Sequence, residues 1–205
     1  FNDQASPSHL VLTMDGEPGT DFTVSIYADT NDLDLLPFAM NYLPGNWTWQ
    51  TASASASVWV ELDQTGLQSL QGKLGNMQLQ AIENSGSHNI DLQNAAADFT
   101  LARDASNTSD DDGWSLAMQN IALEWQQTPW TVPSLQLQFP ANATGELTLK
   151  TSQLDLAMLD QILGDALPMP ADAAGALQTL GPRGLLNNMT FATALDGSYA
   201  NGFLL

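Results

Sequence analysis

Few residues in this chain have the type and spacing that enzymatic chemistry requires. The two histidines, His9 and His88, have no serine, cysteine or glutamate in a recognisable catalytic context. The sequence also contains no Gly-x-Ser-x-Gly elbow, no His-Glu-x-x-His helix and no phosphate-cradling glycine loop. Carboxylates are so abundant that a chance pair of them would indicate nothing about catalysis. We therefore expect a protein that is not an enzyme and has no cofactor.

One acidic cluster invites a calcium interpretation. Asp110, Asp111 and Asp112 lie together in "ARDASNTSDDDGWS". The spacing of an EF-hand loop fails, because no acidic residue lies five positions before Gly113 and no glutamate follows at the required place. We interpret this segment as a solvated loop between two strands, and we predict no metal site.

Positive charge is rare, and one arginine occupies a constrained position. In "LQTLGPRGLLNNMTFA", Gly181 suits a left-handed helix cap, Pro182 stops a helix, and Gly184 permits close backbone approach. Arg183 would then lie at the negative end of a helix, where a guanidinium can bond unpaired carbonyl groups. We interpret these four residues as a structural junction.

The composition excludes several classes of partner. Only four Lys and Arg residues stand against 23 Asp and Glu, which gives a formal net charge of −19. This negative field repels nucleic acid, so we expect no nucleic-acid partner. Disulfides and thiolate metal sites are excluded because the chain has no cysteine. No stretch approaches the ~20 apolar residues of a membrane span. The chain begins without methionine, and we expect residues 1–205 to be a single fragment of a longer polypeptide.

Apolar and polar residues alternate with period two along most of the chain, which predicts half-buried antiparallel strands. Residues 9–28 and 56–74 each predict two strands joined by a turn, at Asp15–Gly19 and at Asp63–Gly66. In "WSLAMQNIALEW" the parity of the apolar positions changes between Gln119 and Asn120. A regular strand would turn the second apolar set to the opposite face, so we predict a bulge there.

The alternation collects a set of apolar side chains that are candidates for a binding surface. They are Leu116, Met118, Leu123, Leu135, Leu137, Phe139, Leu147 and Leu149. In a sandwich these residues would pack against a second layer, whereas in an open sheet they would line an apolar trough. The period-two pattern is the same in both cases.

Three segments favour helix: residues 31–44, 151–165 and 170–184. In the second, Ser152 is the expected N-cap and Gly164 the expected stop. The stretches 22–38 and 145–159 share a strand, a Thr-led cap, a Leu-Asp-Leu sequence and a short helix. We therefore expect two related strand–helix units, starting near residues 21 and 144.

Three segments resemble the AsmA-like superfamily, and most closely its YhdP branch of large envelope proteins. They are "VWVELDQTGLQSLQGKLGNMQLQ", "SQLDLAMLDQILGDALPMP" and "LQTLGPRGLLNNMTF". The resemblance implies a mainly β protein, with a curled antiparallel sheet that forms a trough with an apolar inner face and carries two or three short helices. It also implies the periplasm of a Gram-negative bacterium, an inner-membrane anchor outside this fragment, and a part in moving phospholipid to the outer membrane.

On this resemblance, we expect a segment of a lipid-transfer conduit. Its partners would be phospholipid acyl chains and the rest of its own longer chain, with membrane contact through regions outside the fragment. In this setting, Arg183 has a second possible role as a contact for a lipid phosphate.

Two other functions remain open. One is a structural or assembly module of the cell envelope with a fully packed apolar face. The other is an exported carbohydrate-binding module, with tryptophans that are exposed and coplanar. The six candidates are Trp47, Trp49, Trp59, Trp114, Trp125 and Trp130, whose ordinary role is packing.

Overall fold

The computed structural model describes residues 8–17, 21–39, 47–86, 88–104, 113–140, 145–166, 175, 179 and 181–194. The elements in chain order are β1 (His9–Gly16), β2 (Phe22–Asp34), α1 (Leu36–Ala39), β3 (Trp47–Asp63), β4 (Gly66–Glu83), β5 (Asn89–Asp104), β6 (Gly113–Trp125), β7 (Thr128–Phe139), β8 (Glu146–Asp155), α2 (Leu156–Ala166) and β9 (Leu185–Ala194).

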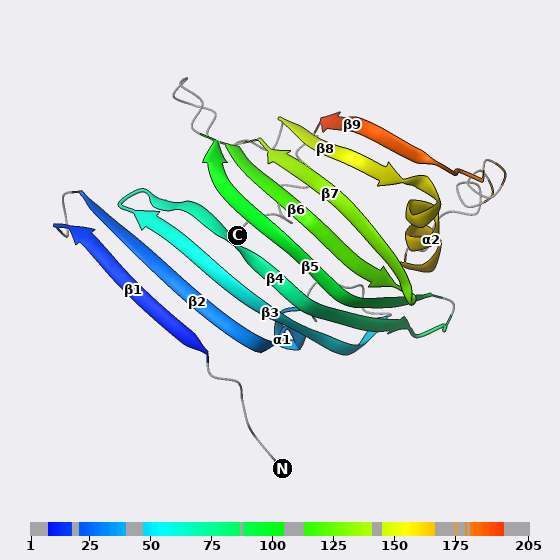
Figure 1. The fold of residues 1–205 in the computed structure, drawn as a ribbon, viewed down its shortest axis with the longest axis horizontal. Helices are drawn as coiled ribbons and strands as arrows, with labels where there is room; N and C mark the ends of the chain where they lie inside the picture. Colours follow the sequence, from blue (N-terminus) through cyan, green and yellow to red (C-terminus); the bar gives the residue numbers. More distant parts are fainter. Residues whose placement is uncertain are drawn as a thin grey trace, which may run out of the picture.

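All nine strands belong to one antiparallel sheet whose spatial order follows the chain from β1 to β9 (Figure 1). Each strand from β2 to β8 pairs with the strand before it and the strand after it. The sheet does not close on itself, so β1 and β9 are its two edges. The prediction of a mainly β, antiparallel fold is confirmed.

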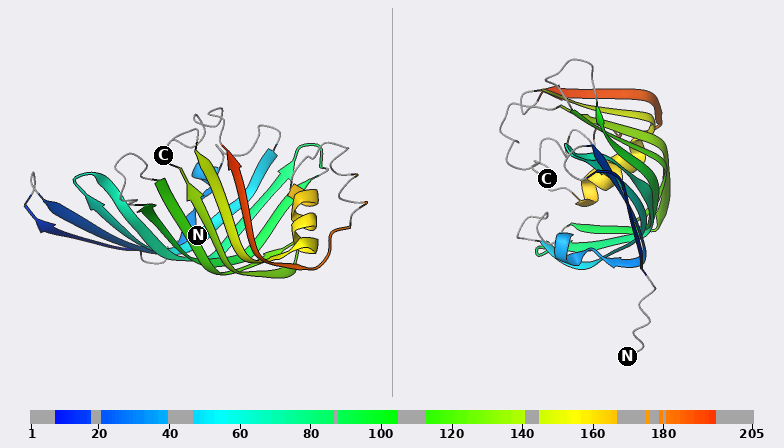
Figure 2. Two further views of the ribbon diagram at one scale, coloured as in Figure 1. Left: turned by 90° about the horizontal axis from the view of Figure 1, so that it is seen from above. Right: turned by 90° about the vertical axis from the view of Figure 1, so that its left-hand side faces the viewer.

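The sheet is curved, and both labelled helices lie on its concave side (Figure 2). The indole Nε1 of Trp125 in β6 donates a hydrogen bond of 3.0 Å to Asp165 Oδ2 in α2. Near α1, the backbone N–H of Leu35 donates to the carbonyl of Ala52 in β3 at 2.8 Å. Both short helices are therefore tied to the sheet where it curves.

The described residues form a single layer with a small core, because no second sheet lies against the first. The buried apolar side chains are Ala52, Ala54, Ala81, Ala95, Ala97, Trp125, Val132 and Met158. Most of them are alanines, and no large side chain among the described residues is fully buried. A two-layer sandwich is thus not the architecture of this part of the chain.

The predicted bulge in β6 is confirmed. Asn120 has a φ of 53°, and the pairing between β5 and β6 shifts between Ala96–Ala122 and Asp98–Gln119. Its side-chain amide donates to Asp98 Oδ2 at 2.7 Å. The extra residue lets Met118 and Ile121 lie on the same face, as the parity change in the sequence requires.

Strands β4 and β5 have similar irregularities in the same region of the sheet. Asn76 in β4 and Asn94 in β5 also have positive φ, at 48° and 51°. The register shifts beside them, between Leu74 and Met77 and again between Met77 and Leu79. Asparagine tolerates this left-handed conformation better than most residues, which explains its repeated use.

The two predicted turns meet different outcomes. Asp63 pairs with Gly66, which confirms the second hairpin. Asp63 Oδ1 accepts hydrogen bonds from the N–H and the hydroxyl of Thr65, at 2.6 and 2.7 Å. The Thr65 hydroxyl is the main cause that lowers the pKa of Asp63, followed by the Thr65 N–H. The first turn brings Gly16 opposite Phe22, while residues 18–20 lie outside the described part.

Two helix predictions need correction. Residues 31–34 continue β2, paired with β3 at Leu33–Ala54 and Asp34–Ser53, and only a single helical turn follows. Strand β8 likewise runs through Ser152 to Asp155, so Ser152 is not the N-cap. Asp155 Oδ1 takes that role and accepts from the N–H groups of Ala157 and Met158, at 2.9 and 3.3 Å.

The ends of the remaining helix predictions also differ from expectation. Gly164 lies inside α2 and does not end it. In the third segment Gly175 and Thr179 are helical, while 170–174, 176–178 and 180 lie outside the described residues. The number of helices therefore stays a prediction.

The two strand–helix stretches use the same local device. Asp34 Oδ1 accepts from the N–H of Leu36 at 2.9 Å, as Asp155 Oδ1 does from the N–H of Ala157. In both, the aspartate of Leu-Asp-Leu stands where a strand changes to a helix. That the two stretches are units of an internal repeat stays a prediction.

Candidate functional site

The strand register gathers apolar side chains into a row across the whole sheet. Residues directly opposite each other on neighbouring strands lie on the same face. The row, which we call the inner ladder, comprises Leu12, Ile26, Val60, Leu70, Leu101, Leu116, Leu137, Leu149 and Phe191. Every strand therefore contributes one aliphatic or aromatic side chain to a single line.

The inner ladder lies on the concave face. Trp125 bonds to α2, which lies on the concave side of the sheet. Alternation along β6 keeps Leu123 and Ile121 on the same side as Trp125. The bulge at Asn120 then brings Met118 and Leu116 to that side too. The apolar face of the sheet and its concave face are thus the same.

All eight apolar residues singled out in the sequence are half-buried. Pairing places Leu116, Leu137 and Leu149 side by side in the inner ladder. Met118 lies opposite Leu135, Phe139 opposite Trp114, and Leu123 opposite Trp130. Leu147 follows two residues before Leu149 in β8, so alternation puts it on the same face.

The apolar face is larger than the sequence analysis proposed, because it continues over β1 to β5. The added side chains include Leu12, Ile26, Val60, Leu70 and Leu101 of the inner ladder. The signal was available, since these residues follow the same period-two alternation. Towards β1 the face becomes open, and Leu12 is 62% exposed.

At one margin of this face lies an arginine that the sequence analysis did not single out. Arg103 in β5 lies opposite Trp114, two residues beyond Leu101. Its Nη1 donates to Thr65 Oγ1 at 3.4 Å, in the turn between β3 and β4. Arg103 is also a minor cause of the lowered pKa of Asp63. The Arg103 guanidinium thus connects β5 to the turn between β3 and β4.

A model of the YhdP protein family matches residues 1–201. The chain belongs to the YhdP family. Membership indicates a bacterial envelope protein and confirms the resemblance seen in the sequence. No curated protein and no solved structure matches this YhdP-family chain.

The two glycines of the junction in this YhdP-family chain both have positive φ, but Gly184 has open space around it rather than the close backbone approach that we expected. Gly181 has a φ of 47° and Gly184 a φ of 113°. The carbonyl of Gly184 accepts a hydrogen bond of 3.0 Å from the N–H of Leu156, which begins α2. Pro182 is half-buried and Arg183 is exposed. The helix carbonyls that Arg183 was expected to bond belong mostly to residues outside the described part.

The six tryptophans of the YhdP-family chain do not form one exposed surface. Trp125 is buried, and only Trp59 is exposed, at 41%. The remaining four are half-buried. Trp59 is thus the one tryptophan with an exposed side chain, and a carbohydrate-binding face built from several tryptophans stays a prediction.

The described residues contain neither a metal-binding group of side chains nor a helix that could span a membrane. Asp110, Asp111 and Asp112 lie outside the described residues, and the described ones contain no group of side chains that could hold a metal ion. None of the helices described for this YhdP-family chain is long and apolar enough to cross a membrane.

Proposed function

We propose that this chain is a segment of a periplasmic conduit that binds phospholipid acyl chains on its concave face. The inner ladder carries the proposal, because it offers an apolar side chain on each of the nine strands. YhdP-family membership agrees with a place in the cell envelope. The conduit would carry out no chemistry, and its anchor in the inner membrane would lie in other parts of the protein.

The energetics favour acyl chains as the cargo. Removing one methylene from water contributes about 0.8 kcal/mol, so even partial burial of an acyl chain gives useful affinity. With neighbouring strands ~4.8 Å apart, nine strands span about 38 Å. This run of equivalent apolar contacts has no polar side chain to stop a lipid at one position, which suits passage along the face.

The competing interpretation is a structural module of the envelope whose apolar face is closed by protein. The two interpretations differ in whether the concave face is accessible. The half-buried state of the eight candidate residues supports an accessible face, since a packed core would bury them fully.

The decisive experiment compares two neighbouring positions in β7. Leu137 lies on the concave face, and Gln136 lies on the convex face beside it. The protein and its Leu137→Asp and Gln136→Asp variants are purified and extracted with organic solvent, and the lipids are measured by mass spectrometry. We expect stoichiometric phospholipid with the parent protein and with Gln136→Asp, and its loss with Leu137→Asp.

Circular dichroism of both variants checks that the fold is retained. A folded, lipid-free parent protein that also ignores an added fluorescent phospholipid would refute the conduit and favour the structural module. Equal lipid loss in the two folded variants would show that the concave face is not where lipid binds.

A further inference from the structure

The convex face has a different chemistry from the concave one. Moving one residue along each strand from the inner ladder gives a second row, which we call the outer ladder. It comprises Val11, Tyr27, Trp59, Gln71, Thr100, Ala117, Gln136, Lys150 and Thr190. From β4 to β9 this row carries amides, hydroxyls, an alanine and one ammonium group. On β1 to β3 it carries Val11 and the two aromatic rings of Tyr27 and Trp59.

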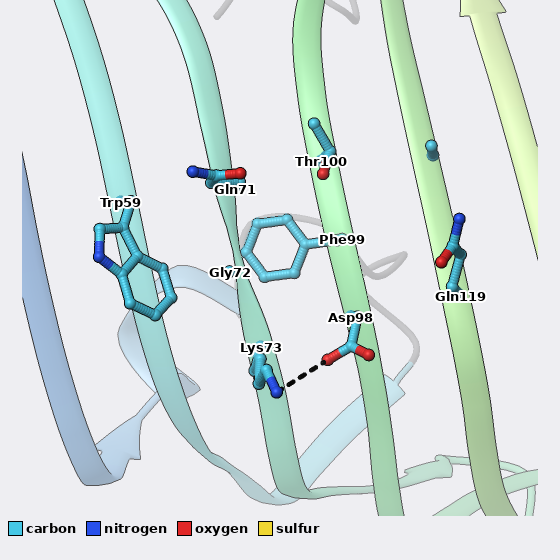
Figure 3. Close-up of a pocket in the computed structure, with 9 residues that line it drawn as sticks. Trp59, Gln71, Gly72, Lys73, Asp98, Phe99, Thr100 and Gln119 are labelled. Atoms are coloured by element: carbon cyan, nitrogen blue, oxygen red, sulfur yellow. Dashed lines mark ion pairs between the residues drawn. The ribbon is translucent and has the colours of Figure 1, made fainter.

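Two shallow depressions lie on this face, and they meet. The first, of about 360 Å³, includes Trp59, Gln71 and Thr100 in its lining (Figure 3). The second, of about 480 Å³, includes Gln136, Lys150 and Thr190. Both are lined by Ala117 and Gln119, so they adjoin, and we call the two together the polar trough. Its lining also includes the apolar residues Phe99, Met118, Leu135 and Met189. The trough crosses the strands from β3 to β9, over six spacings of ~4.8 Å.

An aromatic platform stands at one end of the polar trough. Trp59 is 41% exposed, and its ring centroid lies 4.8 Å from that of Tyr27, at an interplanar angle of 37°. An exposed indole presents an apolar ring face beside polar groups, which matches the apolar C–H face of a sugar ring. The small side chain of Ala117 leaves space between the strands that carry the amides.

The net charge of the whole chain, rather than that of the lining of the polar trough, favours a ligand with little or no negative charge. Lys73 and Asp98 form an ion pair of 3.8 Å, which leaves Lys150 as the uncompensated charge among the lining residues. Two of the four basic residues of the chain thus lie here. The chain as a whole carries −19, which repels a polyanion.

The position of the polar trough within the sheet limits the class of ligand further. A peptide that binds by strand addition needs unpaired backbone groups at a sheet edge. Strands β3 to β8 are paired on both sides, so along the trough up to β8 a ligand must be recognised by side chains, and backbone groups of an edge strand are within reach only at its β9 end. Glutamine amides both donate and accept hydrogen bonds, and hydroxyl groups do the same, so this lining suits a ligand rich in hydroxyls and amides.

We propose that the polar trough binds a linear, uncharged glycan that lies across the strands, with one sugar ring on Trp59 and with Gln71, Gln119 and Gln136 bonding its hydroxyl and acetamido groups. This site is on the face opposite the lipid-binding one and does not depend on it. The protein would then bind a polysaccharide on its convex face and lipid on its concave face.

Titration calorimetry with a hexamer of β-1,4-linked N-acetylglucosamine tests the proposal. The variants are Trp59→Ala and Gln119→Ala, and the control is Gln138→Ala, in β7 on the same face but outside both depressions. We expect the hexamer to bind the parent protein and the control alike. Loss of the aromatic platform should weaken binding about tenfold.

Three results would overturn the proposal. They are no heat of binding for the hexamer at millimolar concentration, equal affinity of Trp59→Ala and Gln138→Ala, and a preference for an unstructured peptide over the hexamer. Retained phospholipid is measured in the same preparations, and we expect Trp59→Ala to keep it. The glycan site and the lipid face can therefore fail separately.

Discussion

The bulge at Asn120 makes a quantitative prediction about stability. Asn120 is exposed, has a φ of 53° and donates a hydrogen bond to Asp98 Oδ2. Asn120→Ala removes the bond and leaves an alanine in the left-handed region, which costs about 1–2 kcal/mol relative to a glycine there. Asn120→Gly removes the same bond but adopts this backbone freely.

The lost hydrogen bond costs about 1 kcal/mol in both variants, at the low end for a bond to a charged group because the site is exposed. Because Asn120 itself already bears part of the cost of the left-handed backbone, the alanine variant should be less stable than the parent by about 1–2 kcal/mol, and the glycine variant by about 1 kcal/mol or less. With a urea m-value of roughly 2–3 kcal/mol/M, the two midpoints should differ by about 0.5 M.

Urea unfolding followed by tryptophan fluorescence measures this difference. Ser115, in the same strand, does not have a positive φ and serves as the control position. There the order should reverse, because glycine in a regular strand costs about 0.5–1 kcal/mol relative to alanine. An Asn120→Ala protein as stable as Asn120→Gly would refute the argument that a left-handed residue holds the apolar phase of β6.

Three other substitutions test the remaining structure. Asp155→Ala removes the N-cap of α2 and should cost about 1 kcal/mol, seen as faster amide exchange in α2, whereas Asp160→Ala should leave exchange nearly unchanged. Gly72→Ala would place a Cβ against Ser57 O and 3.1 Å from Phe99 Cζ, so it should lower the thermal midpoint, while Gly164→Ala, with open space around it inside α2, should raise it. Because the pKa of Asp63 is lowered in the fold, this carboxylate stabilises the protein above its unfolded pKa of about 3.9, and the contribution is lost as the pH falls from there through the folded pKa. The stability of Asp63→Asn should therefore depend less on pH in acid than that of the parent. An unchanged acid unfolding profile would contradict this.

Local patterns in the sequence predict much of this fold. Alternation predicts the strands, and the parity change between Gln119 and Asn120 predicts the bulge, because a bulge alone keeps Met118 and Ile121 on one face. The hairpin at Asp63–Gly66 is equally local. Three short segments of sequence also resemble the YhdP family, and the family model that matches residues 1–201 confirms this.

Features set by neighbouring strands are harder to predict. Residues 31–34 have a helical pattern but pair with β3, and the paired strand determines their conformation. Ser152 precedes Asp155 as a possible cap, yet Gln153 and Asp155 pair with β9 and delay the start of α2. The direction of curvature is not encoded in any single strand. For this reason the sequence predicts that Leu137 and Gln136 lie on opposite faces of the sheet. It does not predict which of these faces is concave and which is convex.

The sequential order of the strands has a mechanical consequence. Each strand is hydrogen-bonded only to its neighbours in the chain, so a pulling force on either end acts on one edge strand at a time. Such a sheet unzips hairpin by hairpin, since no crossover connection locks distant strands together. Extension at constant speed should give a series of small, similar rupture events. The same arrangement lets strands add to the growing edge in the order of synthesis, so folding can follow the ribosome.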